Sequence, residues 1–560
     1  MIKALKQIKL SLIVVLSLLL VLLLVSCTKE KKSTSKKEEK KQDLIVDVIA
    51  DYGAKGNGIA SDRAAIQKAI DEVNLNGGGT VVLTAGHTFL SGNLLMRSNV
   101  KLLIDDNACL LQNPDVNDYI EVRGYDYGDG FVEIGEHYIP YTDGVNMIKE
   151  GKYADIWPGV NDYLEAWHWN YPFIYADKGT ENICVTGGEN AIIKFAEHGD
   201  SCKGNIHMNG FGYYRVTNFE VSNLTIYYTG QHLMDYICCN EGLVYNVFAE
   251  TKRAIGQSEC RMNDGIHIDR CKNILVENCT FASGDDSFKV GSSYGDIRRD
   301  RWASSTDYQT TENIEVSNVN CPGLCSGFAF VTIAGTAPDI SEVEMRNIYV
   351  HDCNFAGVKV WGQNTVWLPD RSMWNGVYTP ITGLRWENNN TYYSLEGYVH
   401  QIQGILYLEP ISDCISDDPL IHSMTEVRNF DFSLKKSYWC FENENGSVAI
   451  VQSYDDVSYG YIGDLDKGVS KIYEGLYLES GSYQAEFMCK NSSGAKVYLF
   501  ISDQKGNVLY KKTINSSSWE TFTLEFALSK TDNYRIGIAS ELGSDEFSWA
   551  MIDNFKLIKK

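Results

Sequence analysis

One kind of short segment recurs through the middle of the chain and limits the folds it can adopt. Each copy alternates apolar and polar residues over one short strand and ends near an asparagine. The five copies are residues 181–187, 217–223, 272–279, 312–319 and 341–348. Asparagine tolerates the left-handed backbone of a tight turn, so each copy predicts a strand bounded by a turn. The recurrence predicts a stacked β-solenoid. An antiparallel sandwich of short strands is the alternative, but two-residue hairpin signals are few.

The spacing of the copies indicates coils of unequal length. The interval from Asn218 to Asn273 is much longer than the intervals from Asn182 to Asn218 and from Asn273 to Asn313. A solenoid coil takes roughly 20 to 25 residues, which is shorter than any of the three. Some of these intervals therefore span two coils, and others carry loops.

Three carboxylates are spaced by about one coil. Asp264 precedes Asp285 by 21 residues and Asp286 by 22. In a stacked solenoid, that offset returns the chain to a position about 4.8 Å further along the stack. The three acids are therefore predicted to be neighbours in space.

Such a carboxylate cluster is suited to glycoside hydrolysis. One protonated acid donates a proton to the leaving oxygen, while an ionised partner activates water on the other side of the sugar ring. Grouped aspartates also bind Ca²⁺, as a polysaccharide lyase requires. A purely structural aspartate ladder that bonds turn amides is the third interpretation.

Length and composition favour a large protein of more than one folded unit that does not bind nucleic acid. The 560 residues are 44% hydrophobic and 12% aromatic, which is ample for a sizeable core. The formal charge is −23, and such a surface repels nucleic acid. The chain lacks paired cysteines at metal-binding spacing, so no metal or other cofactor is expected. Cysteines in or next to the repeats are predicted to be small core residues, namely Cys184, Cys271, Cys279 and Cys321.

The first 43 residues predict export and attachment to a membrane. Three lysines precede an apolar run over residues 10–25, and Ser26 stands directly before Cys27. Residues 1–27 resemble a bacterial lipoprotein signal peptide, which implies that Cys27 is lipidated at the outer face of the membrane. A simple membrane anchor is the alternative. Residues 28–43 are almost entirely polar and predict a flexible tether.

The segment after the tether predicts a capped solenoid. Ser61 or Asp62 is expected to cap a helix that ends at Gly77, and strands follow. Such a helix would cover the open first coil. The aromatic-rich residues 113–170 interrupt the pattern and are expected to form a wall of the binding cleft, with a packing role as the alternative.

The C-terminal part has a different pattern. After a predicted linker at residues 396–426, residues 427–560 contain alternating strands separated by Gly, Asn and Ser turns, which predicts an antiparallel β-sandwich. One of the predicted strands is Asn429–Phe432. The closing segment Ile552–Phe555 resembles the jelly-roll carbohydrate-binding modules of bacterial polysaccharidases. Such a likeness does not by itself establish sugar binding.

Several motifs in order carry a family resemblance. The cap, Pro172–Ala176, Asn263–His267 and Gly284–Asp286 resemble glycoside hydrolase family 28, the polygalacturonases, within the pectin-lyase-like group. The resemblance implies a right-handed parallel β-helix over residues 44–395. It also implies that Asp285 is the general acid, and that Asp264 and Asp286 position and activate water.

The sequence departs from the family around these acids. The family's Asn-Thr-Asp is Met262-Asn263-Asp264 here, its Gly-His-Gly is Cys325-Ser326-Gly327, and its Arg-Ile-Lys is Lys359-Val360-Trp361. The substrate-binding candidates are Asn263, His267, Ser326, Lys359 and Trp361. His267 is equally consistent with a packed core histidine and Lys359 with a solvated lysine. Arg298, Arg299 and Arg301 are candidates for replacing the lost cations, or are surface charges.

The resulting hypothesis is an exported, lipid-anchored and monomeric inverting hydrolase of a polysaccharide. Galacturonan is the first substrate expected, and a neutral α-glycan is the alternative. Ca²⁺-dependent β-elimination on the same scaffold is a second alternative, although no lysine or arginine is evident beside the acids. A glycan-binding surface protein without catalytic activity is the third.

Overall fold

The computed structural model describes most of residues 44–560. The longer gaps are residues 120–130, 141–171, 196–209, 252–263, 293–309, 332–343, 362–379, 393–410, 433–437 and 542–547. The predicted signal peptide, the tether and Cys27 lie outside the described residues, as does most of the 113–170 insertion. Their assignments stay predictions. Within the described part of the chain, no helix has the length and apolar character needed to cross a membrane.

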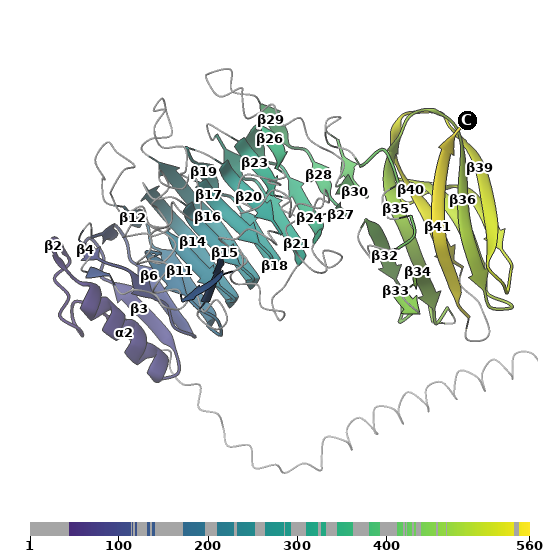
Figure 1. Ribbon diagram of the computed structural model, residues 1–560. Coiled ribbons are helices and arrows are strands. Elements are labelled where there is room, and N and C mark those ends of the chain that lie inside the picture. Colours follow the sequence, from purple (N-terminus) through teal and green to yellow (C-terminus); the bar gives the residue numbers. More distant parts are fainter. Residues whose placement is uncertain are drawn as a thin grey trace, which may run out of the picture. The chain divides into compact units, whose positions relative to one another are not determined.

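Two sheets of parallel strands run along the axis of a β-helix, and each is built from the strands of successive coils (Figure 1). The smaller sheet runs in the order β5 (Leu94–Leu95), β10 (Ile174–Ala176), β13 (Phe211–Tyr214), β15 (His232–Ile237), β17 (Asp264–Asp269), β20 (Asp286–Gly291), β23 (Ser326–Val331) and β26 (Val358–Trp361). We call it the eight-stranded sheet. Its paired strands are parallel throughout.

The larger sheet has 21 strands and completes the coils. Its strands are β1 (Leu44–Asp47), β2 (Asn57–Ser61), β3 (Gly79–Leu83), β4 (Thr88–Ser91), β6 (Val100–Ile104), β7 (Cys109–Gln112), β11 (Glu181–Gly187), β12 (Ile192–Lys194), β14 (Thr217–Tyr228), β16 (Asn240–Thr251), β18 (Lys272–Glu277), β19 (Thr280–Ala282), β21 (Thr310–Ser317), β22 (Asn320–Cys321), β24 (Glu344–His351), β25 (Asn354–Ala356), β27 (Ile381–Thr382), β28 (Arg385–Glu387), β29 (Asn390–Tyr392), β30 (Ile411–Ser412) and β31 (Ile415–Ser416). The predicted parallel β-helix is therefore confirmed.

The repeat asparagines form a ladder at one corner of the coils. Asn182, Asn218, Asn273, Asn313 and Asn347 all adopt positive φ angles between 54° and 57°. Each side-chain amide donates a hydrogen bond to the residue above or below it, as Asn313 does to Asn273 at 2.9 Å. The long interval from Asn218 to Asn273 contains two coils, because β14 pairs with β16 and β16 pairs with β18.

Aromatic and thiol side chains fill the interior of the β-helix. Phe288 and Phe328 from adjacent coils stack with ring centroids 5.1 Å apart. Cys271, Cys279 and Cys321 are buried as predicted, whereas Cys184 is only partly buried. All eleven cysteines of the described part of the chain are free thiols. The nine that are buried pack as small core side chains rather than as a disulfide framework.

A helix covers the first coil, as predicted. Helix α2 (Arg63–Leu75) buries the apolar stripe formed by Ile66, Ala69, Ile70 and Val73. Asp62 occupies the N-cap position, but its carboxylate makes no capping bond. It instead accepts the backbone N–H groups of Lys55 and Gly56, at 2.5 and 3.0 Å. The preceding turn competes with the helix for this carboxylate, which the local sequence pattern did not reveal.

The C-terminal part consists of two five-stranded antiparallel sheets (Figure 1). One contains β32 (Trp439–Asn443), β35 (Ser470–Leu478), β40 (Asp532–Ser540), β37 (Val497–Asp503) and β38 (Val508–Ile514). The other contains β33 (Val448–Tyr454), β34 (Val457–Gly463), β41 (Ala550–Lys559), β36 (Gly481–Asn491) and β39 (Glu520–Leu528). Two further short strands, β8 (Phe131–Ile134) and β9 (His137–Pro140), form a separate antiparallel pair.

Two local predictions were wrong. The expected strand Asn429–Phe432 is not formed, since Phe430 and Asp431 lie in a turn. Phe432 has a φ of 52° and stacks on Trp439 with the centroids 4.5 Å apart. Parallel pairing also continues past residue 395, because β30 and β31 fall inside the predicted linker at residues 396–426. Strands of two residues are too short to show an alternating pattern.

The asparagine ladder can be tested at Asn273, which is exposed and has a φ of 57°. Its amide donates to Asn240 and its carbonyl accepts from Asn313, each at 2.9 Å. Asn273→Ala is expected to lower the free energy of unfolding by about 1 to 2 kcal/mol, because alanine is strained in this conformation and both bonds are lost. Asn273→Gly removes the bonds without the strain, so urea denaturation should show a smaller loss. Equal losses in both variants would contradict the role of the backbone conformation.

Candidate functional site

Three neighbouring strands of the eight-stranded sheet each carry two polar residues three positions apart. The six residues, which we call the charged cluster, are His232 and Asp235 in β15, Asp264 and His267 in β17, and Asp286 and Lys289 in β20. His232 is in register with Asp264, and His267 is in register with both Asp235 and Lys289. All six are buried. Stacking therefore converts a repeated local spacing into one compact polar site.

The predicted juxtaposition of Asp264 and Asp286 is present. The backbone N–H of Asp286 donates to Oδ1 of Asp264 at 3.2 Å. Gly265 permits this close approach of the two coils, because a Cβ atom there would lie 2.0 Å from the carbonyl oxygen of Ser287. The offset between Asp264 and Asp286 is thus one coil.

Lys289 connects these two carboxylates. Its Nζ lies 2.7 Å from Oδ2 of Asp264 and 3.3 Å from Oδ2 of Asp286. A buried ammonium between two carboxylates stabilises their ionised forms. It also offsets the repulsion that two carboxylates on adjacent coils would otherwise suffer.

Two histidines connect Asp264 to Asp235. The Nε2 atoms of His232 and His267 lie 3.2 and 2.9 Å from Oδ2 of Asp264. Their Nδ1 atoms lie 3.0 and 3.1 Å from the two carboxylate oxygens of Asp235. The two rings have centroids 4.0 Å apart. His267 is therefore placed beside Asp264, as the sequence suggested.

Burial and charge shift the pKa values in this cluster in opposite directions. Burial would raise the pKa of Asp264, but the charge of Lys289 and the contacts with both imidazoles more than offset it, so the pKa is lowered. Burial also acts to raise the pKa of Asp235, and its contacts with His232 and His267 lower it well below the usual value. Burial, reinforced by the neighbouring His267, lowers the pKa of His232 to about 4 despite the nearby carboxylates. Asp264 and Asp235 are thus ionised, and His232 is neutral near pH 7.

The other predicted site residues are only partly described. Ser326 lies on β23 and is in register with Asp286 of β20. Lys359 and Trp361 lie on β26, and Lys359 pairs with Ala329 of β23. Ala329 in turn pairs with Lys289. Lys359 therefore lies in the same transverse row as His267 and Lys289, two strands beyond Lys289.

Several predicted residues have no described placement. Asn263, Asp285 and the loop arginines Arg298, Arg299 and Arg301 lie outside the described residues. The role of Asp285 as general acid stays a prediction.

His232, Asp235 and Lys289 were not predicted as site residues. A signal was present, because His-x-x-Asp, Asp-x-x-His and Asp-x-x-Lys begin three consecutive strands. The offset from His232 to Asp264 is longer than that from Asp264 to Asp286, which hides the match from a search at one fixed period. The expectation that no basic residue lies beside the acids, which counted against elimination, was wrong, because Lys289 lies there.

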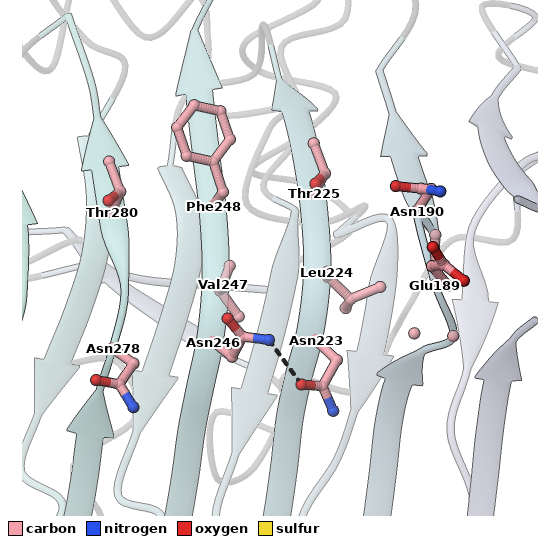
Figure 2. Close-up of a pocket in the computed structure, with 13 residues that line it drawn as sticks. Glu189, Asn190, Asn223, Leu224, Thr225, Asn246, Val247, Phe248, Asn278 and Thr280 are labelled. Atoms are coloured by element: carbon pink, nitrogen blue, oxygen red, sulfur yellow. Dashed lines mark hydrogen bonds between the residues drawn. The ribbon is translucent and has the colours of Figure 1, made fainter. Parts of the chain in front are cut away.

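A separate groove of about 670 Å³ lies on the 21-stranded sheet (Figure 2). Its walls are formed by the turn between β11 and β12, by the middle of β14 and of β16, and by the start of β19. Turn asparagines recur along it, and Asn246 donates to Asn223 at 2.9 Å. Glu189 is the one carboxylate among its described lining residues, and no basic side chain joins it there. Because hydrolysis requires two carboxyl groups, the charged cluster is the better candidate active site.

Two parts of the β-helix match models of known protein families. Residues 194–364 match the model of glycosyl hydrolases family 28, and residues 45–114 match the model described as rhamnogalacturonase A/epimerase, pectate lyase-like. Both matches agree with the resemblance that the motifs implied. The family 28 match includes the whole charged cluster.

Individual relatives are distant or match over short segments. A probable polygalacturonase of Vitis vinifera is 23% identical over 252 residues, which is 44% of each chain. Mannuronan C5-epimerase AlgE1 of Azotobacter vinelandii is 44% identical over 62 residues, which is 10% of this chain and 4% of that protein. The family 28 exopolygalacturonase of Yersinia enterocolitica has a TM-score of 0.41 and 17% identity, over 62% of this chain and 59% of that chain. The chain thus spans less than half the length of these two curated relatives.

The lowered pKa of His232 predicts a pH-dependent stability. The pKa of a histidine in the unfolded chain is about 6.5. Between about pH 6.5 and 4 the unfolded state therefore binds one more proton than the folded state, and the free energy of unfolding decreases as the pH is lowered. Since the folded value is about 4, the full loss should be about 3 kcal/mol. Between about pH 7 and pH 4, the free energy of unfolding measured in urea should decrease more in the wild type than in His232→Gln, and the difference should be about this amount. His351→Gln, outside the cluster, should follow the wild type, and parallel profiles for His232→Gln and the wild type would contradict the assignment.

Proposed function

We propose that this chain, whose residues 194–364 match the model of glycosyl hydrolases family 28, hydrolyses α-linked glycosidic bonds of a pectic polysaccharide with inversion. The observation that supports this most directly is the pair of buried carboxylates, Asp264 and Asp286, on adjacent coils with Lys289 between them. A water-activating base must be ionised, and the ammonium of Lys289 favours that state.

The general acid in this proposal is Asp285. It precedes Asp286 in the sequence, and ionised carboxylates nearby raise the pKa of a further carboxyl group. A raised pKa keeps the proton that the leaving oxygen needs. Asp264 and Asp286 then orient and activate the water that attacks from the opposite side of the sugar ring.

Galacturonan is the proposed substrate because cationic residues continue along the sheet from the acids. Lys359 lies on β26 in the transverse row of Lys289. Lys289 is engaged with Asp264, so Lys359 is the proposed partner of a substrate carboxylate. A lysine provides a point charge and lacks the fork of an arginine, which predicts a modest preference for the uronate.

β-Elimination from a uronate is a second candidate, and Lys289 is the observation in its favour. A base beside acids that bind a cation is what this chemistry requires. However, Lys289 as an ammonium paired with Asp264 has no lone pair to accept a proton. Hydrolysis is therefore better supported. An unsaturated product that absorbs in the ultraviolet would identify elimination.

The catalytic assignment predicts that Asp285→Asn and Asp286→Asn each lower kcat on galacturonan by about 10² to 10⁴. Reducing-end release measures the rate, and proton NMR of the first product should show the β-anomer. Glu315→Gln, an exposed acid of β21, should retain wild-type activity. Near-normal hydrolysis by Asp285→Asn would remove Asp285 as the acid, and an α-anomeric first product would exclude inversion.

The substrate assignment predicts that galacturonan is cleaved faster than the same polymer after its carboxyl groups have been reduced to alcohols. Lys359→Met should raise KM for galacturonan by about 10-fold, through loss of one charge-assisted contact. It should leave the reduced polymer unaffected. If the wild type prefers the reduced polymer, the substrate is a neutral α-glycan instead.

A further inference from the structure

We propose that His232, His267 and Asp264 form a binding site for a divalent transition metal ion, with Zn²⁺ as the representative ion. One ring nitrogen of each histidine and one carboxylate oxygen of Asp264 lie within 4.8 Å of one another. This site goes beyond the proposed function, because hydrolysis by three carboxylates does not require a metal.

The three ligand atoms converge at distances suited to such an ion. The Nε2 atoms of His232 and His267 lie 3.2 and 2.9 Å from the same oxygen, Oδ2 of Asp264. In a tetrahedral Zn²⁺ site with bonds of about 2.0 Å, neighbouring ligand atoms are about 3.3 Å apart. A small outward movement of these side chains would therefore admit the ion.

Asp235 holds both histidines in the orientation that metal binding requires. Its two oxygens lie 3.0 Å from Nδ1 of His232 and 3.1 Å from Nδ1 of His267. Metal-ligating histidines almost always donate their second ring N–H to a carboxylate, a carbonyl or water, which fixes the tautomer. Here one buried carboxylate serves both rings, and the two Nε2 atoms are directed to one point.

A count of protons and lone pairs shows what a metal would add. A neutral imidazole carries one N–H and one lone pair. When His232 and His267 donate from Nδ1 to Asp235, both Nε2 lone pairs face an oxygen of Asp264. In that tautomeric state the three lone-pair-bearing atoms converge on one point, so a divalent cation there would be coordinated by all three.

Lys289 supplies part of that positive charge and therefore competes with the metal. Its Nζ lies 2.7 Å from Oδ2 of Asp264, and Oδ2 of Asp286 at 3.3 Å offers it an alternative partner. Removing the ammonium should accordingly tighten metal binding. A site that only provides a hydrogen-bond network would show no such gain.

The ligand types select the class of metal. Two imidazole nitrogens with one carboxylate suit Zn²⁺, Fe²⁺, Co²⁺ or Ni²⁺, whereas Ca²⁺ takes six to eight oxygens. Three protein ligands leave at least one position open for water or a sugar hydroxyl. Cysteine spacing predicted no metal site, and it gives no signal for these histidines, which lie far apart in the sequence on different coils.

The test is metal binding by the full chain in the absence of glycan. After dialysis against a chelator, the wild type should bind one equivalent of Zn²⁺ by calorimetry, and Co²⁺ in its place should give visible ligand-field absorption bands. Asp235→Asn should weaken binding by about 10- to 100-fold. His232→Gln and His267→Gln should abolish the stoichiometric binding, and Lys289→Gln should strengthen it.

Controls separate this site from others in the chain. His351 faces Asp352 and Glu315 on the 21-stranded sheet, so His351→Gln tests an adventitious histidine-carboxylate pair. Circular dichroism and thermal unfolding show whether each variant is folded. The proposal is overturned if neither the wild type nor Lys289→Gln binds Zn²⁺ or Co²⁺, or if binding survives in His232→Gln and His267→Gln but is lost in His351→Gln. Because no substrate is present, a failure of the proposed hydrolysis leaves this result unaffected.

Discussion

Parallel pairing between β15, β17 and β20 is the constraint on which the rest of the site depends. Hydrogen bonds between adjacent coils hold their backbones about 4.8 Å apart. At that spacing, residues one coil apart in the sequence become direct neighbours, such as Asp286 and His232 on either side of Asp264. The asparagine ladder and the interior aromatic stacks fix this register from other parts of the same coils. The polar cluster is therefore carried on a rigid framework rather than on loops.

Charge compensation then decides what the cluster contains. Three buried carboxylates cannot be ionised at so short a spacing without partners, since desolvation and mutual repulsion both oppose it. Lys289 and the two histidines supply those partners. The same groups that stabilise the carboxylates also define their chemistry. Asp264 is the residue most affected, because its Oδ2 atom meets an ammonium and two imidazoles.

The two proposals place different demands on Asp264. As part of a hydrolase, it orients water beside Asp286, and as a metal ligand it shares an oxygen with an ion. The demands are compatible, because an open metal position binds water or a hydroxyl, and Asp286 lies outside the metal ligand set. The departures from the family pattern fall at residues 262–264, 325–327 and 359–361, next to the acids in sequence or on neighbouring strands of the same sheet.

Much of the fold was predictable because its signals are local. The strand-asparagine repeats predicted the coils, since a left-handed turn residue and an alternating strand each depend on a few neighbouring residues. The offset between Asp264 and Asp286 predicted their contact, because it equals one coil. The strands β30 and β31 and the turn at Phe432 were not predicted, since two-residue strands and a packed turn carry no periodicity.

The sequence by itself therefore determined the parallel β-helix, the C-terminal sandwich and the pairing of two carboxylates. Tertiary structure alone decided which other residues join them. His232, Asp235 and Lys289 come from coils of unequal length, so their convergence depends on register across the sheet. Their protonation depends on burial and on contacts between different strands. Neither quantity is encoded in any one segment of the chain.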